Sequence, residues 1–148
     1  MSPQFIRDRK RGRAAQDYVA NTFKAWGLQV SNVKDGYFPG WDLVVSGNLH
    51  GNHLNFKAEV KYDIKAQETN NLYLDIEALK HSKASILCIC INNPIDTVLM
   101  LPLQDALNYA VKHCNAQGGE FQEKSAIIPI EQFISDLKPK ILTTKNHG

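Results

Sequence analysis

Cysteine is scarce in this sequence, with Cys88, Cys90 and Cys114 as its three examples. An odd number of cysteines in apolar segments is typical of reduced, buried thiols and does not suggest a disulfide framework. Cys88 and Cys90 are too close for a CxxC pair, and no histidine follows at zinc-finger spacing, so we expect no zinc site. These features predict a cytoplasmic, intracellular protein.

Long hydrophobic runs are also missing. No apolar stretch reaches the roughly 18 residues that a membrane-spanning helix needs, so we expect no membrane association. The basic N-terminus is not followed by an apolar segment, so we do not expect a secretory signal. The sequence also lacks GxGxxG, P-loop and GxSxG patterns, and we expect no small-molecule cofactor. No helix-turn-helix, zinc finger or aromatic RNA-binding pattern is present.

Charge of one sign is not in large excess, since the formal net charge is +2. Affinity for nucleic acid therefore cannot be argued from the total, but the distribution is uneven. Five basic residues gather near the N-terminus, with one acid among them: Arg7, Arg9, Lys10, Arg11 and Arg13. Such a cluster can neutralise phosphates without reading sequence. A solubilising tail is the alternative explanation.

The length of 148 residues suits one domain, with residues 1–10 and 140–148 as flexible termini. Hydrophobic periodicity predicts one helix, a run of strands, a second helix, a short strand and a last helix. The predicted helices span 11–26, 103–113 and 130–137, and the predicted strands span 28–33, 41–45, 53–61, 72–76, 85–91, 97–101 and 126–130. This order predicts an α/β fold, with a mixed central sheet flanked by helices.

The stretch from residue 39 to residue 65 carries the most chemistry. It reads as a hairpin with glycines and asparagines at the turn, and its second strand alternates polar and apolar residues. Glu59 and Lys61 therefore share one face, and an antiparallel partner can bring Asp42 beside them. Two carboxylates can hold Mg²⁺, while the lysine can orient a water or stabilise charge on a phosphate.

Asp42 together with Glu59-Val60-Lys61 resembles the PD-(D/E)XK nuclease signature, with Gly40-Trp41-Asp42 where the first motif often has Pro-Asp. The resemblance covers roughly residues 10–110. It implies a restriction-endonuclease-like core of order α-β-β-β-α-β, with Asp42 and Glu59 as metal ligands and Lys61 as the catalytic lysine. It also implies Mg²⁺ as cofactor, which Mn²⁺ can replace. The segment 68–75 resembles small phage nucleases, so a phage-encoded protein is one expectation.

The predicted first helix bears on the metal site. Resolvase-like members of this family carry a basic residue, a glycine and then a glutamate there. This chain has Arg11-Gly12, with Gln16 at the position of the glutamate and Asp17 beside it. Gln16 can offer a neutral oxygen, whereas Asp17 is charged but points about 100° away on a helix. Which of the two joins the site, whether both merely face solvent, and whether one or two metals bind all stay open.

Other interpretations of the hairpin remain. The acid-x-Lys pattern occurs four times, and Asp63/Lys65 is the rival to Glu59/Lys61 because it has the same strand parity. A solvated charged strand face with cross-strand ion pairs is the structural alternative. Lys57 and Lys65 share the strand face of Glu59 and can extend the basic track toward a scissile phosphate.

The sequence thus predicts a Mg²⁺-dependent endonuclease acting on DNA, although RNA is not excluded. Resolvase-like, homing and restriction-type substrates all remain compatible. We expect a homo-oligomer, a dimer or higher, because one site cuts one strand. The alternative is a non-catalytic nucleic-acid-binding domain that keeps the fold without the chemistry.

Overall fold

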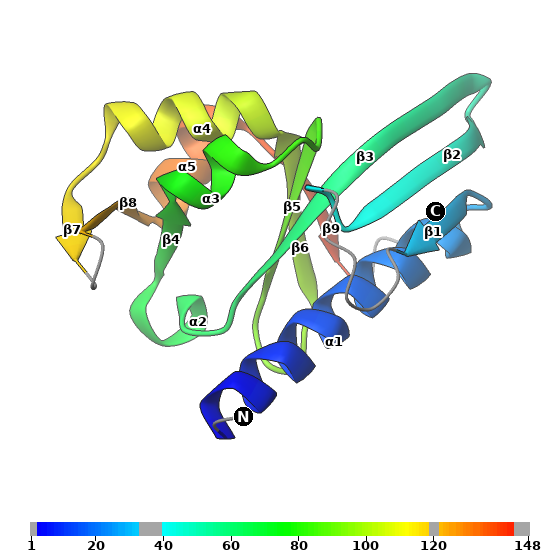
Figure 1. Cartoon of the computed structure of the whole chain (residues 1–148). Coiled ribbons are helices and arrows are strands. Elements are labelled where there is room, and N and C mark those ends of the chain that lie inside the picture. Colours follow the sequence, from blue (N-terminus) through cyan, green and yellow to red (C-terminus); the bar gives the residue numbers. More distant parts are fainter. Residues whose placement is uncertain (1–2, 33–39, 119–121, 144–148) are drawn as a thin grey trace.

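The computed structural model describes residues 3–32, 40–118 and 122–143. The helices are distributed among the strands along the chain, as Figure 1 shows. In order they are α1 (Pro3–Ala25), β1 (Gln29–Asn32), β2 (Leu43–Leu49), β3 (Asn52–Asp63), α2 (Ala66–Thr69), β4 (Asn71–Asp75), α3 (Ile76–His81), β5 (Ile86–Ile91), β6 (Thr97–Pro102), α4 (Leu103–Lys112), β7 (Ala116–Gly118), β8 (Glu123–Pro129), α5 (Ile130–Leu137) and β9 (Lys140–Thr143).

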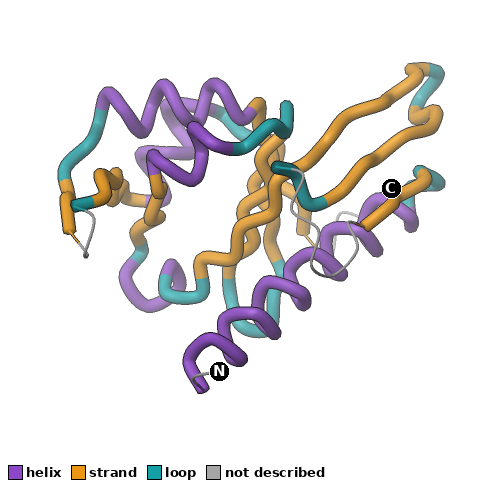
Figure 2. Tube along the Cα trace, in the orientation of Figure 1, coloured by secondary structure: helices purple, strands orange, loops and turns teal. Residues whose placement is uncertain are grey.

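A six-stranded sheet forms the centre, in the order β1-β2-β3-β5-β6-β9 (Figure 2). The β3–β5 pair is parallel and the other pairs are antiparallel, so the sheet is mixed. This confirms the predicted α/β fold with a mixed central sheet between helices. The β2–β3 hairpin extends beyond the rest of the sheet (Figure 1).

Each face of the central sheet has its own hydrophobic core. Alternate residues of β5 point into the two cores. Leu87 and Ile89 pack in the core that includes α3, α4 and α5, while Cys88 and Cys90 pack in the core that includes α1. Because β5 is covered on both faces, its sequence is continuously apolar. The predicted burial of Cys88 and Cys90 is confirmed, but that of Cys114 was wrong, since it is exposed just after α4.

The segment between β3 and β5 departs from a simple strand succession. The predicted strand at 72–76 exists as β4, but it pairs with β8 in a separate three-stranded sheet, β4-β8-β7. Residues 66–71 lie between the predicted strands 53–61 and 72–76, where no helix was predicted, and they contain the single-turn helix α2. The path from β3 to β5 thus passes through α2, β4 and α3, which gives a parallel connection the room that it needs.

Two predicted boundaries were wrong. The first helix begins at Pro3 instead of near residue 11, and proline is well tolerated in a first helical turn. Residues 140–143 of the expected polar tail form the edge strand β9, where Leu142 is buried opposite Val98 of β6. In the described ranges, no helix is both long enough and apolar enough to cross a membrane.

Candidate active site

Asp42 lies just before β2 begins, where β3 continues without β2 but stays paired with β5 on its other edge. The register pairs Leu43 with Ala58, which sets Asp42 level with Glu59. The Asp42 backbone N–H donates to the Ala58 carbonyl at 2.9 Å. The Val60 N–H lies beyond the last residue pair of β2 and β3, and it donates instead to the side chain of Asp42, at 2.7 Å from Oδ2. The backbone of β3 therefore fixes the position of the Asp42 carboxylate.

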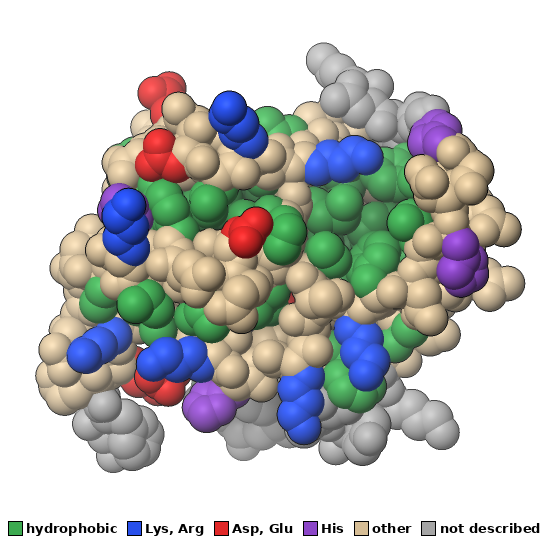
Figure 3. Space-filling model, turned by 90° about the horizontal axis from the view of Figure 1, so that it is seen from above, with side chains coloured by type: hydrophobic (Ala, Val, Ile, Leu, Met, Phe, Trp, Pro, Cys, Tyr) green, Lys and Arg blue, Asp and Glu red, His purple; other side chains and the backbone are tan. Residues whose placement is uncertain are grey.

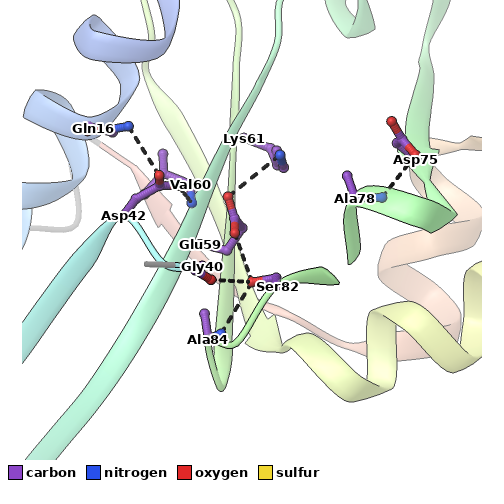
Figure 4. A network of polar contacts seen from close by, with 10 residues as sticks. All are labelled: Gln16, Gly40, Asp42, Glu59, Val60, Lys61, Asp75, Ala78, Ser82 and Ala84. Atoms are coloured by element: carbon purple, nitrogen blue, oxygen red, sulfur yellow. Dashed lines mark hydrogen bonds and ion pairs between the residues drawn. The ribbon is translucent and has the colours of Figure 1, made fainter. Parts of the chain in front are cut away.

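Glu59 and Lys61 project from β3 on the same face (Figure 4). The Glu59 side chain is 13% exposed and its Oε2 lies 3.6 Å from Lys61 Nζ, while Lys61 is 46% exposed. Lys61 thus reaches toward solvent beside a carboxylate that is mostly enclosed. The structure brings Asp42, Glu59 and Lys61 into one cluster, as the alternation of β3 predicts.

Ser82, which follows α3, holds Glu59 in place. Its hydroxyl lies 2.8 Å from Glu59 Oε1 and 3.2 Å from the Gly40 carbonyl, and it accepts the Ala84 N–H at 3.2 Å. Gly40 has φ +101°, and a Cβ there would come within 3.0 Å of Lys83. Sequence reasoning missed Ser82, because it lies 23 residues from Glu59 with no local motif to mark it.

Gln16 is the contribution of α1 to the site. Its side-chain amide donates to Asp42 Oδ1 at 3.3 Å, across 26 residues of sequence. Asp17, the other residue considered for this position, is exposed on the helix. Of the two, Gln16 is therefore the one beside the carboxylates.

The rival pair lies further along β3. Asp63 Oδ2 accepts the Tyr73 N–H at 2.8 Å. Burial raises the pKa of Asp63, and hydrogen bonds from the backbone of Tyr73, Ala66 and Lys65 oppose that rise. Lys65 is exposed at the start of α2. The Asp63 carboxylate thus serves the local backbone, and these contacts give it a structural role at the strand end.

The predicted phosphate-binding residues lie on α1 and around β3. Lys10 and Arg13 are exposed on α1, and Arg11 is partly buried. Arg7 and Arg9 belong to the same helix, but their side chains lie outside the described part of the chain. Lys57 Nζ sits 3.8 Å from the centre of the Trp41 ring. On the face seen in Figure 3, basic side chains stand apart from one another, with hydrophobic and polar side chains between them.

The electrostatics of the site centre on Asp42. The pKa of Asp42 is raised from 3.8 to about 7, first by burial and then by a hydrogen bond with Glu59 and the charge of Glu59. The Val60 N–H and the charge of Lys61 oppose the rise. Near neutral pH the Asp42 carboxyl is therefore close to its own pKa, and a bound cation would favour its charged form.

Asp42→Asn should stabilise the protein without metal at high pH. A carboxyl whose folded pKa is raised loses its favourable contribution as pH climbs from about 4 to 7, and the amide has no charge to bury. We expect a gain of about 1–2 kcal/mol in the free energy of unfolding at pH 8. This is less than the full pKa shift of Asp42 would give, because water and Lys61 screen its charge. Urea unfolding in EDTA at pH 8 and pH 4.5 measures it. A gain that is the same at both pH values would contradict the assignment.

The donor set of the site fits a hard divalent cation. Among the described residues, no cluster contains three or more of His, Cys, Asp and Glu. The site instead offers two carboxylates and the amide side chain of Gln16. Mg²⁺ accepts this, because it commonly keeps several waters and binds through one or two carboxylates and substrate phosphates.

Fold and site together define an α/β protein whose central hairpin carries two carboxylates and a lysine in one cluster. No protein-family model matches the sequence, and no curated protein matches it. Among solved structures, the chain is similar to a bacterial homing endonuclease, I-Ssp6803I, with a TM-score of 0.50 and 16% identity. The match covers 68% of this chain and 72% of the other. The two chains therefore share a fold.

Proposed function

We propose that this protein is a Mg²⁺-dependent endonuclease that hydrolyses phosphodiester bonds in DNA. The observation that carries the proposal is the cluster of Asp42, Glu59 and Lys61, in which Lys61 Nζ lies 3.6 Å from Glu59 Oε2 and Asp42 is level with Glu59 on the neighbouring strand. The fold held in common with a homing endonuclease supports DNA as the substrate. Resemblance to the PD-(D/E)XK signature supports the same chemistry.

Asp42 and Glu59 are the residues that would hold the metal, with Gln16 able to assist through its amide. When bound, Mg²⁺, or Mn²⁺ in its place, polarises the phosphoryl oxygen and acidifies a water. The protein's own part is positional: the Val60 amide and Ser82 hydroxyl fix the two carboxylates. Lys61 is exposed enough to reach the substrate, where its ammonium can orient the attacking water and stabilise negative charge on the phosphate.

The basic residues supply affinity for the DNA backbone in this proposal. Arg7, Arg9, Lys10, Arg11 and Arg13 all belong to α1, the helix that brings Gln16 to Asp42. A DNA backbone whose phosphates bind along α1 would therefore lead to the carboxylates of Asp42 and Glu59. Lys57 and Lys65 lie on β3 and just after it, and they extend the track on either side of the site.

Cleavage with Lys61→Ala against Lys65→Ala tests the assignment, because the two lysines belong to the rival acid-x-Lys pairs. We expect nicking of supercoiled plasmid in Mg²⁺ to fall about 10²-fold in Lys61→Ala, the lower range for a positioned acid-base group. Lys65→Ala should stay within a few-fold of wild type. Loss of cleavage in Lys65→Ala with retention in Lys61→Ala would transfer the chemistry to the other pair.

We further propose that the enzyme works as a homo-oligomer. The described part of the chain holds one such carboxylate cluster, and one cluster cuts one strand, so cutting both strands of a duplex needs two copies. Sedimentation with and without DNA checks this, and a monomer under both conditions would contradict it.

A second candidate is a DNA-binding domain without catalysis. The neutral Gln16 beside Asp42 favours it, because a glutamate at this position would add a third carboxylate to the site. Calorimetry with Mg²⁺ or Mn²⁺ separates the two functions, since the binding domain should show no metal uptake that depends on Asp42 and Glu59. A panel of supercoiled, linear, single-stranded and branched substrates would then identify the DNA.

A further inference from the structure

The sheet face that carries Glu59 continues away from the site as a polar surface. Every second residue of a strand faces the same way, and antiparallel partners share a face. Moving outward from the level of Asp42 and Glu59, the partners are Val44 with Lys57, then Ser46 with Asn55, then Asn48 with His53. β1 adds Ser31 beside Val44 and Gln29 beside Ser46. We name these residues the polar hairpin face.

This face is open and rich in hydrogen-bonding groups. Six of its side chains are exposed: Gln29, Ser31, Asn48, His53, Asn55 and Lys57. All residues of the polar hairpin face are among those described, and none carries a carboxylate. Val44 is the one aliphatic residue among them, so the face offers little apolar area for another protein.

The opposite face of the hairpin keeps the strands rigid. Val45 is fully buried there, and Phe56 packs edge-to-face on Phe23 of α1 with ring centres 5.8 Å apart. On the polar side, His53 Nδ1 lies 3.3 Å from Asn48 Oδ1. The hairpin therefore presents amides and an imidazole on a two-stranded ribbon whose backbone is held by packing, so little backbone entropy is left to lose on binding.

Duplex DNA fits such a ribbon. The major groove admits a two-stranded β-ribbon, and an asparagine can pair with an adenine edge through two hydrogen bonds. A face without carboxylates approaches phosphates without repulsion, and Lys57 stands between the amides and the catalytic cluster. Each level adds about 6.7 Å along the strands, which places Asn55 about 13 Å and Asn48 about 20 Å from the level of Glu59.

We infer that the polar hairpin face reads the base sequence of duplex DNA in the major groove, about four to six base pairs to one side of the cleaved bond. The offset follows from these lengths and the rise of 3.4 Å per base pair. The inference rests on the proposed function in taking DNA as the substrate and Glu59 as the place of cleavage. Beyond the proposed function, the inference names the residues that would recognise the base sequence of the DNA.

Selection of bound sequences from a random duplex library, in Ca²⁺ in place of Mg²⁺, tests the inference. Wild type should enrich a motif, and Asn48→Ala/Asn55→Ala should lose roughly 30-fold or more of its preference for that motif over scrambled DNA. Both side chains are exposed, so melting should be unchanged. The matched control is Gln104→Ala/Asn108→Ala, an exposed amide pair on α4 joined by a 2.8 Å hydrogen bond, which should keep the preference. Cleavage mapped in Mg²⁺ should fall about four to six base pairs from the motif.

The outcomes separate this inference from the proposed hydrolysis. If wild type cuts DNA but enriches no motif, or if the hairpin variant keeps the motif, sequence reading by the hairpin is overturned and hydrolysis stands. If the variant keeps the motif but no longer self-associates, the face belongs to contacts between copies. If a motif is selected through the hairpin but no substrate is cut, the hairpin inference is supported and hydrolysis fails.

Discussion

Glu59→Gln should lower DNA cleavage in Mg²⁺ by about 10³-fold or more. The substitution removes the charge that the metal needs while keeping the shape, and the amide oxygen can still accept the Ser82 hydroxyl, which lies 2.8 Å from Glu59 Oε1. Loss of a direct metal ligand removes several kcal/mol of transition-state stabilisation, and each 1.36 kcal/mol is tenfold in rate. Plasmid nicking gives the rate, and calorimetry gives the accompanying loss of Mg²⁺ binding.

Asp63→Asn is the matched control for that experiment. Asp63 is also partly buried on β3 with the same parity as Glu59, and asparagine can still accept the Tyr73 N–H. We expect its cleavage to remain within about fivefold of wild type, because Asp63 is not part of the cluster. Glu59→Gln activity as high as that of the control would remove Glu59 from the site.

Phe23→Ala should reduce the free energy of unfolding by about 3–5 kcal/mol, the usual range for a buried phenylalanine. Phe23 is 1% exposed and lies edge-to-face against both Trp26 and Phe56. It anchors α1 to β3, and the same helix carries Gln16 to Asp42. In a protein of this size the melting temperature should fall by about 10 °C or more, measurable by thermal unfolding with circular dichroism.

Tyr73→Ala provides the comparison, since this aromatic residue is 55% exposed on β4. Its removal leaves no buried cavity but takes away the 2.7 Å partner of the buried Ser125 hydroxyl, so we expect a loss of about 1–2 kcal/mol, below that of Phe23→Ala. Equal losses in Phe23→Ala and Tyr73→Ala would mean that α1 does not pack against the sheet as described.

Local pattern was enough for most of the central sheet. The alternation from His53 to Lys61 predicted β3, and the apolar run after Ser85 predicted the doubly covered strand β5. Glu59 and Lys61 share a face because every second residue of a strand points the same way, so their spacing in the sequence is enough to predict it. The position of Asp42 beside Glu59 was also predicted, because the two strands of a hairpin run side by side and their outer ends meet.

Where the sequence predictions failed, the missing information was not local. β4 has an ordinary strand pattern, but its pairing with β8 depends on residues fifty or more positions away. The same pattern would suit either sheet, so it could not say which one β4 joins. β9 reads as part of a polar tail until Leu142 is seen buried opposite Val98.

The sequence by itself determined the mixed α/β fold and which β3 residues share a face, because periodicity is written in neighbouring residues. Only the tertiary structure decided that Ser82 fixes Glu59, that Gln16 reaches Asp42, and that Asp63 serves the backbone. The raised pKa of Asp42 likewise follows first from burial, and then from a second carboxylate brought close by folding. Burial and contacts between distant segments exist only once the chain has folded.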